Sequence, residues 1–397
     1  MRTCLAACLL LTAAPAAAQS HYGERYTEPT EPIVVTGIRI RDYRDRLAAC
    51  LARGCPPNED IDATLALAEA LFLEGEYAEA RTAVRASLRR NRDAAATHPE
   101  PVSDLYRAHM RLSRHMGFDR HALRSAHGIL DALQAGLPEE DYRHFTARYE
   151  LAEIQMMSGR HRQARRSLDR LVDNAREAGR EDVAIMAELR GLYYDHLVYR
   201  FGPARSYLID LANSNDPARR LQSLGAKVLL ARIYRAEGDT ERADSLLAEV
   251  GRGTSARRRL LHAPSYQVLG QPERWDGDLA LEDAGLWGNA LNRWGPNLEG
   301  KWIDVGFWVM PDGSVADVDV VREGAPAGWA DTLLQSIRGR RYSTAEQPTY
   351  RLERYTYTAA WQQASGTRIP QRSPLVRVEY LDLTVSDAPA PPATPAG

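Results

Sequence analysis

The chain has 397 residues, of which 44% are hydrophobic and 26% charged, and its formal net charge is −2. This composition is that of a globular protein with room for two or three domains, and so small a net charge excludes a strong field that would select nucleic acid. Only Lys227 and Lys301 are lysines among 51 basic residues. Because 53 acidic residues balance the arginines, we attribute the excess of arginine to a GC-rich genome rather than to recognition of phosphate or carboxylate ligands.

Residues 1–18 have the pattern of a secretory signal peptide. Arg2 is followed by an apolar run and then by three alanines that end at Ala18, where we expect cleavage. A lipoprotein signal is the weaker alternative, because Cys8 precedes most of the apolar run. No other segment approaches the ~20 apolar residues that a membrane-spanning helix needs. The sequence therefore predicts a periplasmic protein that keeps no transmembrane span after cleavage.

Residues 19–41 are mostly polar and carry one β-prone stretch at residues 31–40, whose central part consists of Ile33, Val34, Val35, Thr36 and Gly37. The proline before this run favours an extended backbone. One interpretation is an ordinary first strand. The other is an exposed peptide that adds a strand to the sheet of a partner.

Residues 42–61 predict a short helix that ends near a pair of cysteines, Cys50 and Cys55. These are the cysteines that remain after cleavage of the signal peptide. In an oxidising compartment such a local pair forms a disulfide. A metal site would need more ligands than cluster here, and redox catalysis favours a C-x-x-C spacing. We predict a structural disulfide, and no metal or cofactor.

Residues 62–250 are helical throughout and carry a repeated signature, in which a glycine is followed five residues later by an alanine. The signature occurs at Gly75, Gly117, Gly159 and Gly238, and a degenerate copy at Tyr199 gives a period of 39 to 42 residues. Glycine permits the left-handed turn that closes one helix, and alanine permits close approach of the next. This pattern predicts an array of helical hairpins.

The first and last units resemble tetratricopeptide repeats. In the first unit the matching residues are Ala68, Leu71, Gly75, Tyr77 and Ala80; the fifth unit matches at Ala231, Tyr234, Gly238 and Ala243. The resemblance implies a curved surface that binds peptides or proteins. A spacer that only holds the flanking parts is the alternative, and sequence does not separate the two.

After a linker at residues 251–300, the hydrophobic period changes from 3.6 to 2. Residues 302–310 and 314–321 predict two strands joined by a Pro-Asp-Gly turn, and residues 329–338 predict an amphipathic helix. A further strand places Tyr355, Tyr357 and Trp361 on one side, residues 375–385 predict another strand, and residues 387–397 predict a disordered tail.

This order of elements, from Lys301 to about Trp361, resembles the C-terminal domain of TonB. The fold class that we expect is α+β, a helical hairpin solenoid followed by a small TonB-like domain at residues 301–386. The resemblance implies binding by strand addition, with Tyr355, Tyr357 and Trp361 at the sheet edge. It also implies that Ile33 to Gly37 is similar to the TonB box, the peptide of outer-membrane receptors that the TonB domain binds. The extra strand at residues 375–385 departs from the family and is placed where it could cover that edge.

We therefore expect a non-enzymatic protein-interaction protein, linked to TonB-dependent transport. Its partners would be TonB, a TonB-dependent receptor, or its own N-terminal segment, and not nucleic acid. One alternative is an envelope-assembly scaffold with no role in energy transduction. Another is an enzyme whose site is assembled from distant residues, for which no catalytic motif or metal-ligand spacing gives support.

Overall fold

The computed structural model describes residues 39–199, 202–251, 260–264, 266, 300–363 and 369–384. The predicted signal peptide, the segment from Ile33 to Gly37, most of the linker and the C-terminal tail lie outside the described residues. The chain divides into two units, Met1–Arg39 and Ile40–Gly397, and the elements from α1 to β6 all belong to the second unit.

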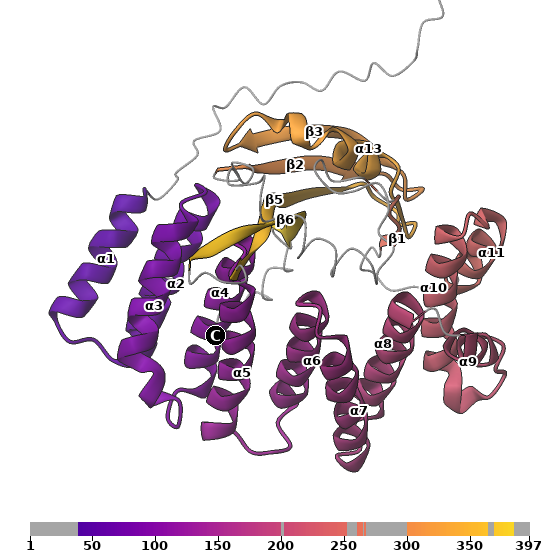
Figure 1. Ribbon diagram of the computed structural model, residues 1–397, viewed down its shortest axis with the longest axis horizontal. Coiled ribbons are helices and arrows are strands. Elements are labelled where there is room, and N and C mark those ends of the chain that lie inside the picture. Colours follow the sequence, from indigo (N-terminus) through magenta and orange to yellow (C-terminus); the bar gives the residue numbers. More distant parts are fainter. Residues whose placement is uncertain are drawn as a thin grey trace, which may run out of the picture. The chain divides into compact units, whose positions relative to one another are not determined.

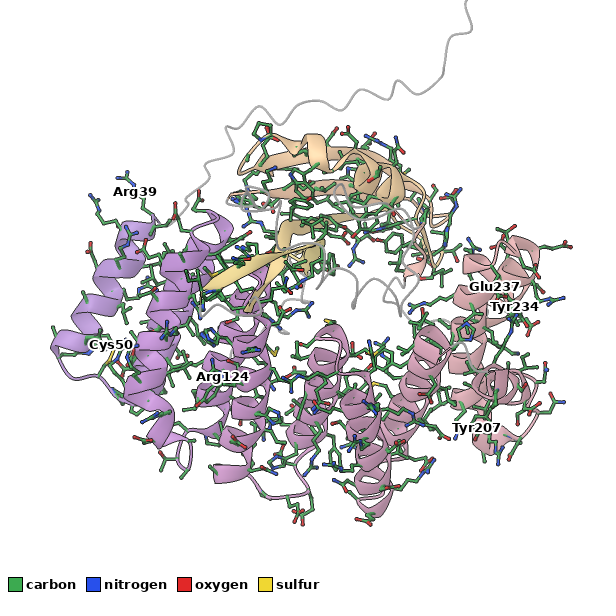
Figure 2. The ribbon with its side chains drawn as sticks, viewed as in Figure 1. Arg39, Cys50, Arg124, Tyr207, Tyr234 and Glu237 are labelled. Carbon is green, nitrogen blue, oxygen red and sulfur yellow. A yellow bond between two sulfur atoms is a disulfide. The ribbon has the colours of Figure 1, made fainter. Side chains whose placement is uncertain are left out.

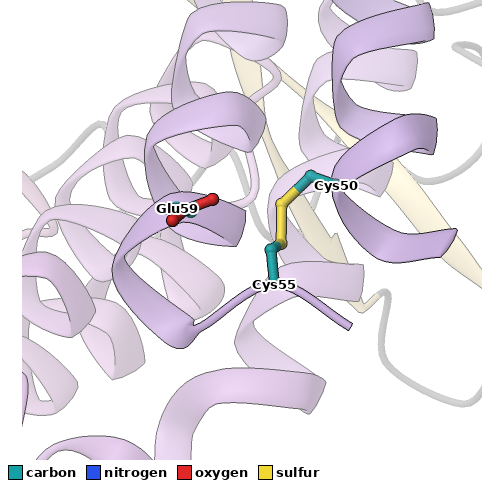
Figure 3. A group of neighbouring side chains, drawn as sticks. All are labelled: Cys50, Cys55 and Glu59. Carbon is teal, nitrogen blue, oxygen red and sulfur yellow. A yellow bond between two sulfur atoms is a disulfide. The ribbon is translucent and has the colours of Figure 1, made fainter. Parts of the chain in front are cut away.

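The predicted disulfide joins the first two helices, α1 (Ile40–Ala52) and α2 (Pro57–Leu73). Cys50 and Cys55 are bonded, with their Cα atoms 5.2 Å apart, across a turn in which Gly54 has a φ of 66°. Glu59 lies beside the disulfide (Figure 3) and accepts a hydrogen bond from Arg53. Because the two sulfurs are bonded to each other, neither is a thiolate that could bind a metal together with Glu59.

In the described part of the chain, five helical hairpins follow one another (Figure 1). They are α2 with α3 (Tyr77–Asn91), α4 (Pro99–His115) with α5 (Asp119–Gly136), α6 (Tyr142–Met157) with α7 (His161–Glu177), α8 (Glu181–Tyr199) with α9 (Gly202–Ala212), and α10 (Arg220–Ala236) with α11 (Thr240–Gly251). Short 3₁₀ turns, Arg92–Ala94 and Pro217–Arg219, precede α4 and α10. Within the described ranges, no helix is long and apolar enough to cross a membrane.

The glycine turns close the first helix of a hairpin as the sequence pattern predicts. Gly75, Gly117, Gly159 and Gly238 have φ values of 82°, 77°, 72° and 89°. In each turn the N–H that follows the glycine bonds to the carbonyl five residues earlier, as when Glu76 N–H donates to Leu71 O at 2.8 Å. This is the 6→1 bond of a Schellman cap. The predicted register is confirmed at these four turns, and the fifth falls at residues 200–201, which are not described.

The alanines of the repeated signature are buried where the two helices of a hairpin cross. Ala80, Ala122, Ala164, Ala204 and Ala243 are at most 7% exposed. Apolar clusters then run from each hairpin into the next, so that every repeat buries its face against a neighbour. A surface contact also joins the last two hairpins. Arg205 of α9 bonds to Glu237 and lies over the ring of Tyr234, and Figure 2 labels the latter two residues.

The C-terminal part is a four-stranded antiparallel sheet in the order β3-β2-β5-β6. Its strands are β2 (Trp302–Val309), β3 (Val315–Glu323), β5 (Thr349–Gln363) and β6 (Pro370–Asp382). A 3₁₀ turn (Ala327–Trp329) and helix α13 (Asp331–Arg338) lie between β3 and β5 in the chain. A separate two-stranded sheet pairs β1 (Leu260–His262) with β4 (Arg341–Tyr342), and β1 lies inside the predicted linker.

One face of the sheet forms an apolar core with α13. Ile303, Val305 and Phe307 of β2 pack with Leu333 and Ile337 of the helix. The alternation of apolar residues along β2 predicts this face correctly. At the level of a helical repeat array joined to a small antiparallel sheet, the expected α+β fold class is confirmed.

The sheet has different edges from those expected. Strand β5 pairs with β2 on one side and with β6 on the other, so it is an inner strand, and the prediction that Tyr355, Tyr357 and Trp361 lie on a sheet edge is wrong for the two tyrosines. Pairing with β2 ends at Thr356, so Trp361 belongs to a part of β5 that extends past β2. The outer strands of the described sheet are β3 and β6.

Candidate functional site: a docking surface on the first two repeat turns

The second face of the sheet carries polar residues and is nevertheless buried. Asp304 of β2, Arg354 and Thr356 of β5, and Glu379 of β6 are all at most 5% exposed. Their alternation with core residues is the pattern of a face in contact with water. Here that face lies against the helical array instead, with β5 beside α4. Buried charges persist only where they are paired and hydrogen-bonded, so the contacts of these residues define the site.

Arg354 caps the C-terminus of α2. Its guanidinium donates to the carbonyl of Phe72 and, at 2.8 Å, to that of Leu73. These carbonyls belong to the last turn of the helix, where the macrodipole favours a positive charge. The same guanidinium makes a two-pronged contact with Asp304, in which Nη2 and Oδ2 are 2.9 Å apart, and Cζ lies 3.8 Å from the ring centroid of Trp302. Every part of this fully buried cation therefore has a partner.

Arg372 repeats the arrangement at α4. Its Nη1 donates to the carbonyl of Met116, the residue after the last residue of α4, at 2.8 Å. Its Cζ lies 4.4 Å from the ring centroid of Trp361, which in turn stacks on Phe118. The backbone N–H of Trp361 donates to the carbonyl of Gly117 at 2.8 Å. The turns at Gly75 and Gly117, which are 42 residues apart, are thus each contacted by an arginine that is stacked on a tryptophan.

The glycines of these two turns are required for a second reason besides their positive φ. A Cβ atom at Gly75 would lie 2.2 Å from Trp302 Nε1, and one at Gly117 would lie 1.9 Å from the carbonyl oxygen of Ala359. A Cβ atom at Gly159 or Gly238 would meet nothing within 4 Å. The four turns look alike in sequence, but in the described structure only the turns at Gly75 and Gly117 lie directly against the sheet.

An ion-pair network joins β6 to the α4–α5 turn. Arg377 contacts Asp119 at 2.7 Å, and Arg114 contacts Glu379 at 2.6 Å. Arg377 also bonds to Glu379 at 2.7 Å. Burial acts to raise the pKa of Glu379, but the charges of Arg114 and Arg377 outweigh it and hold that pKa below its usual value. Glu379 therefore stays ionised although it is buried between β6 and the helical array.

A hydroxyl and an imidazole meet in the middle of the surface. The hydroxyl of Thr356 lies 2.8 Å from Nδ1 of His115 and 3.0 Å from the hydroxyl of Tyr77. Burial lowers the pKa of His115 to about 4, so its ring is neutral at pH 7. A pocket of about 220 Å³ beside this surface is lined by Arg114, Arg377 and other residues, and neither His115 nor Thr356 reaches it. The hydroxyl–imidazole pair lies outside that pocket and joins β5 of the sheet to α3 and α4 of the array.

The structure separates the residues that the sequence grouped as a binding edge. Tyr355 and Tyr357 lie in the core of the sheet, and the hydroxyl of Tyr355 accepts a hydrogen bond from Arg340 at 2.7 Å. Trp361 lies on the docking surface and contacts the array. The peptide from Ile33 to Gly37 is outside the described residues, so its role stays a prediction.

Sequence reasoning missed Arg354, Arg372, Asp304, Glu379 and His115. The sequence contained one signal for an interface between array and sheet: a long helical array is followed by a sheet that has charged residues along one face. Ionisable residues on alternate strand positions normally face water, so this signal did not point to an interface.

We predict that replacing Arg354 with Met destabilises the protein strongly. The change leaves Asp304 with only Arg322 as a charged partner, and it leaves two carbonyls of α2 without a donor. Loss of one member of a buried ion pair costs about 3–5 kcal/mol. Urea unfolding of Arg44→Met, which removes an exposed pair with Glu79, is the control and should change by no more than about 1 kcal/mol. Equal losses in the two variants would contradict the assignment.

We predict different costs for the same substitution at two turns. Gly159→Ala forces a residue with a side chain into positive φ, which costs roughly 1 kcal/mol. Gly117→Ala has the same cost and also forces the sheet away from the turn. Its free energy of unfolding should therefore fall by about 2 kcal/mol more, as for a substitution that overpacks a core. Urea unfolding measures both values. If the two variants unfold alike, the sheet does not lie against Gly117 in solution.

We predict that stability falls as the pH is lowered from about 6.5 towards 4. The pKa of His115 is about 4 in the folded protein, so in this window the unfolded chain binds a proton that the folded chain does not. At 1.36 kcal/mol per unit, the loss from this group approaches about 3 kcal/mol. His115→Asn keeps an acceptor for Thr356 and should flatten the profile. Part of the slope should remain, because burial also lowers the pKa of His109, to about 3. An unchanged slope would show that His115 is accessible to water.

Comparison with known proteins does not place the chain in a family. No protein-family profile and no curated protein matches it. The structure is similar to BtubC (BKLC) from P. vanneervenii, at 16% identity and a TM-score of 0.38, over 57% of this chain and 94% of that one. It is also similar to a putative kinesin light chain from Podosopora anserina with nearly identical TPR-like repeats, at 17% identity and a TM-score of 0.36, over 49% of this chain and 94% of that one. The helical array described above rests on its own hairpins and needs no support from these matches.

Proposed function

We propose that this chain is a non-enzymatic scaffold that binds other proteins in the periplasm. The observation that carries this proposal is the double contact of Arg354 and Arg372 with successive repeat turns. Through these contacts the array already binds a folded sheet, the one at the C-terminal end of its own chain. A tandem array uses the same turn geometry at each repeat, so the remaining turns are suited to further protein contacts.

Two turns support this view because they are unoccupied among the described residues. Gly159 and Gly238 have the same positive φ and the same 6→1 cap as the two docked turns. A Cβ atom at either position would meet nothing within 4 Å. A partner that brings an arginine to these helix ends would find the same carbonyl acceptors that Arg354 and Arg372 find in the docked turns.

The proposed link to TonB-dependent transport is strand addition. Within the described part of the sheet, β3 pairs only with β2, so its other side offers backbone donors and acceptors to an added strand. Strand β6 pairs with β5 and occupies the side where the resemblance to TonB places the partner. The run from Ile33 to Gly37 is the peptide that we propose for addition, to the sheet of TonB or to β3 of a second copy.

The alternative is an envelope-assembly scaffold that has no role in energy transduction. The pairing of β6 with β5 favours this alternative. A TonB-like domain in which this side of β5 is already paired would not bind receptor peptides in the manner of the family. In this case the unoccupied turns of the array are the binding surface and the N-terminal peptide has no partner.

The N-terminal peptide decides between the two candidates. We predict that an immobilised peptide of residues 31–40 retains purified TonB C-terminal domain or the mature form of this protein. Val35→Pro removes a backbone donor and should weaken retention at least tenfold. Val35→Ala keeps the donor and should retain binding. If neither protein is retained, or if the proline variant binds equally well, strand addition is wrong and the envelope scaffold stands.

A further inference from the structure

The array has a pocket of about 480 Å³ between α3 and α5, over α4. Helix α3 contributes Arg81, Arg85 and Arg89, and α5 contributes Arg124, which Figure 2 labels. His109 of α4 also lines it. This volume lies in the range of sites for small ligands. The pocket is formed by the array alone and does not depend on the contacts of the sheet.

The lining of this pocket has no carboxylate. Five of the lining residues are arginines, and none is aspartate or glutamate. Elsewhere in the array, partly buried arginines pair with acids, as Arg107 does with Glu150 at 3.0 Å and Arg165 with Asp195 at 2.9 Å. In the described structure, no ion pair joins Arg85, Arg89 or Arg124 to a carboxylate. Arg92 pairs only with its exposed neighbour Asp93, at 3.5 Å.

The arginines repel one another in the absence of a ligand. Arg81, Arg85 and Arg89 are four residues apart on one helix, a spacing that places like charges about 6 Å apart along the axis. The pKa of Arg81 is lowered by burial and by the charges of Arg85 and Arg124. Burial and the same cluster of arginines also lower the pKa of His121. An anion in the pocket would relieve this repulsion.

The floor of the pocket has polar groups without partners. His109 is 9% exposed, and its Nδ1 lies 2.7 Å from the hydroxyl of Ser125. Among the described residues, its other ring nitrogen, Nε2, has no hydrogen-bond partner, and neither has Nε of Arg81, whose Nη2 bonds to Nδ1 of His121. Buried polar atoms are rarely unpaired in a folded protein unless a ligand or water serves them.

A second pocket repeats the arrangement one period further along. It has a volume of about 370 Å³, and Arg166 and Ser167 line it at positions 42 residues after Arg124 and Ser125. There two of the three lining arginines have partners, since Arg166 Nε bonds to the carbonyl of Arg162 at 3.3 Å and Arg160 bonds to Gln163 at 3.4 Å. The first pocket is lined by five arginines and the second by three. In the first, Arg81 bonds to Nδ1 of His121, and the ion pairs of the described structure leave Arg85, Arg89 and Arg124 for a ligand.

We propose that the pocket of Arg81, Arg85, Arg89 and Arg124 binds a small phosphorylated anion that carries two or more negative charges. Guanidinium groups bind phosphate oxygens through paired hydrogen bonds. Guanidinium donors from two helices, α3 and α5, suit a tetrahedral group, which accepts from several directions, better than a planar carboxylate. The site is independent of the proposed scaffold function, since it uses neither the unoccupied turns nor the N-terminal peptide.

Calorimetric titration of the mature full-length protein with inorganic pyrophosphate tests this proposal. We expect one saturable site whose affinity falls as salt is raised. Arg85→Gln and Arg124→Gln should each weaken binding about tenfold or more, because each removes a charge-assisted contact. Both residues are exposed, so both variants should fold, which circular dichroism would verify. Arg111→Gln, an exposed arginine of α4 outside the pocket lining, is the matched control and should bind as the wild type does.

Citrate serves as the carboxylate probe of comparable charge. Weaker binding of citrate than of pyrophosphate supports a phosphate site. Three results would overturn the proposal: no saturable binding of pyrophosphate at low salt, equal effects of Arg111→Gln and Arg124→Gln, or citrate binding as tight as that of pyrophosphate.

Discussion

The fold of this protein depends on the burial of charged side chains between the sheet and the first two repeats. Arg354 has no exposed surface, and it contacts Asp304, the aromatic ring of Trp302 and the last carbonyls of α2 together. Taking such a cation out of water is costly unless all its donors are satisfied, so the geometry of the helix end and the geometry of the strand must agree closely. This requirement fixes which repeat turn meets which strand.

The same solution is used twice because the array is periodic. Gly75 and Gly117 are one period apart, and each turn offers unpaired helix carbonyls and a surface without a Cβ atom. Arg354 and Arg372 lie on adjacent strands, and each is stacked on a tryptophan. Strand β5 extends past β2, and the N–H of Trp361 in this extension is satisfied by Gly117. The array thereby caps a strand edge that would otherwise be open to association with other chains.

Local signals in the sequence predict much of this structure. The glycine–alanine register predicts the hairpins because the left-handed turn and the helix crossing are each determined by a few adjacent residues. The apolar face of the sheet and the disulfide are predictable for the same reason. The docking surface is not, because its partners are up to 282 residues apart, as Arg354 and Phe72 are. Gly117 and Gly159 carry the same signature, and only tertiary structure distinguishes the docked turn from the open one. Arginine abundance was likewise a weak signal, since the unpaired arginines of α3 become apparent only when α5 lies beside them.

The central claim is that the array and the sheet fold as one unit, and equilibrium unfolding followed by two probes tests it directly. All seven tryptophans lie at or after position 275, whereas the helices of the array lie before position 252. Tryptophan fluorescence therefore reports on the C-terminal part, and far-ultraviolet circular dichroism reports mainly on the array. A docked interface predicts that the two urea transitions coincide in the wild-type protein. Two separate transitions would show that the sheet and the array unfold independently, and would contradict the account.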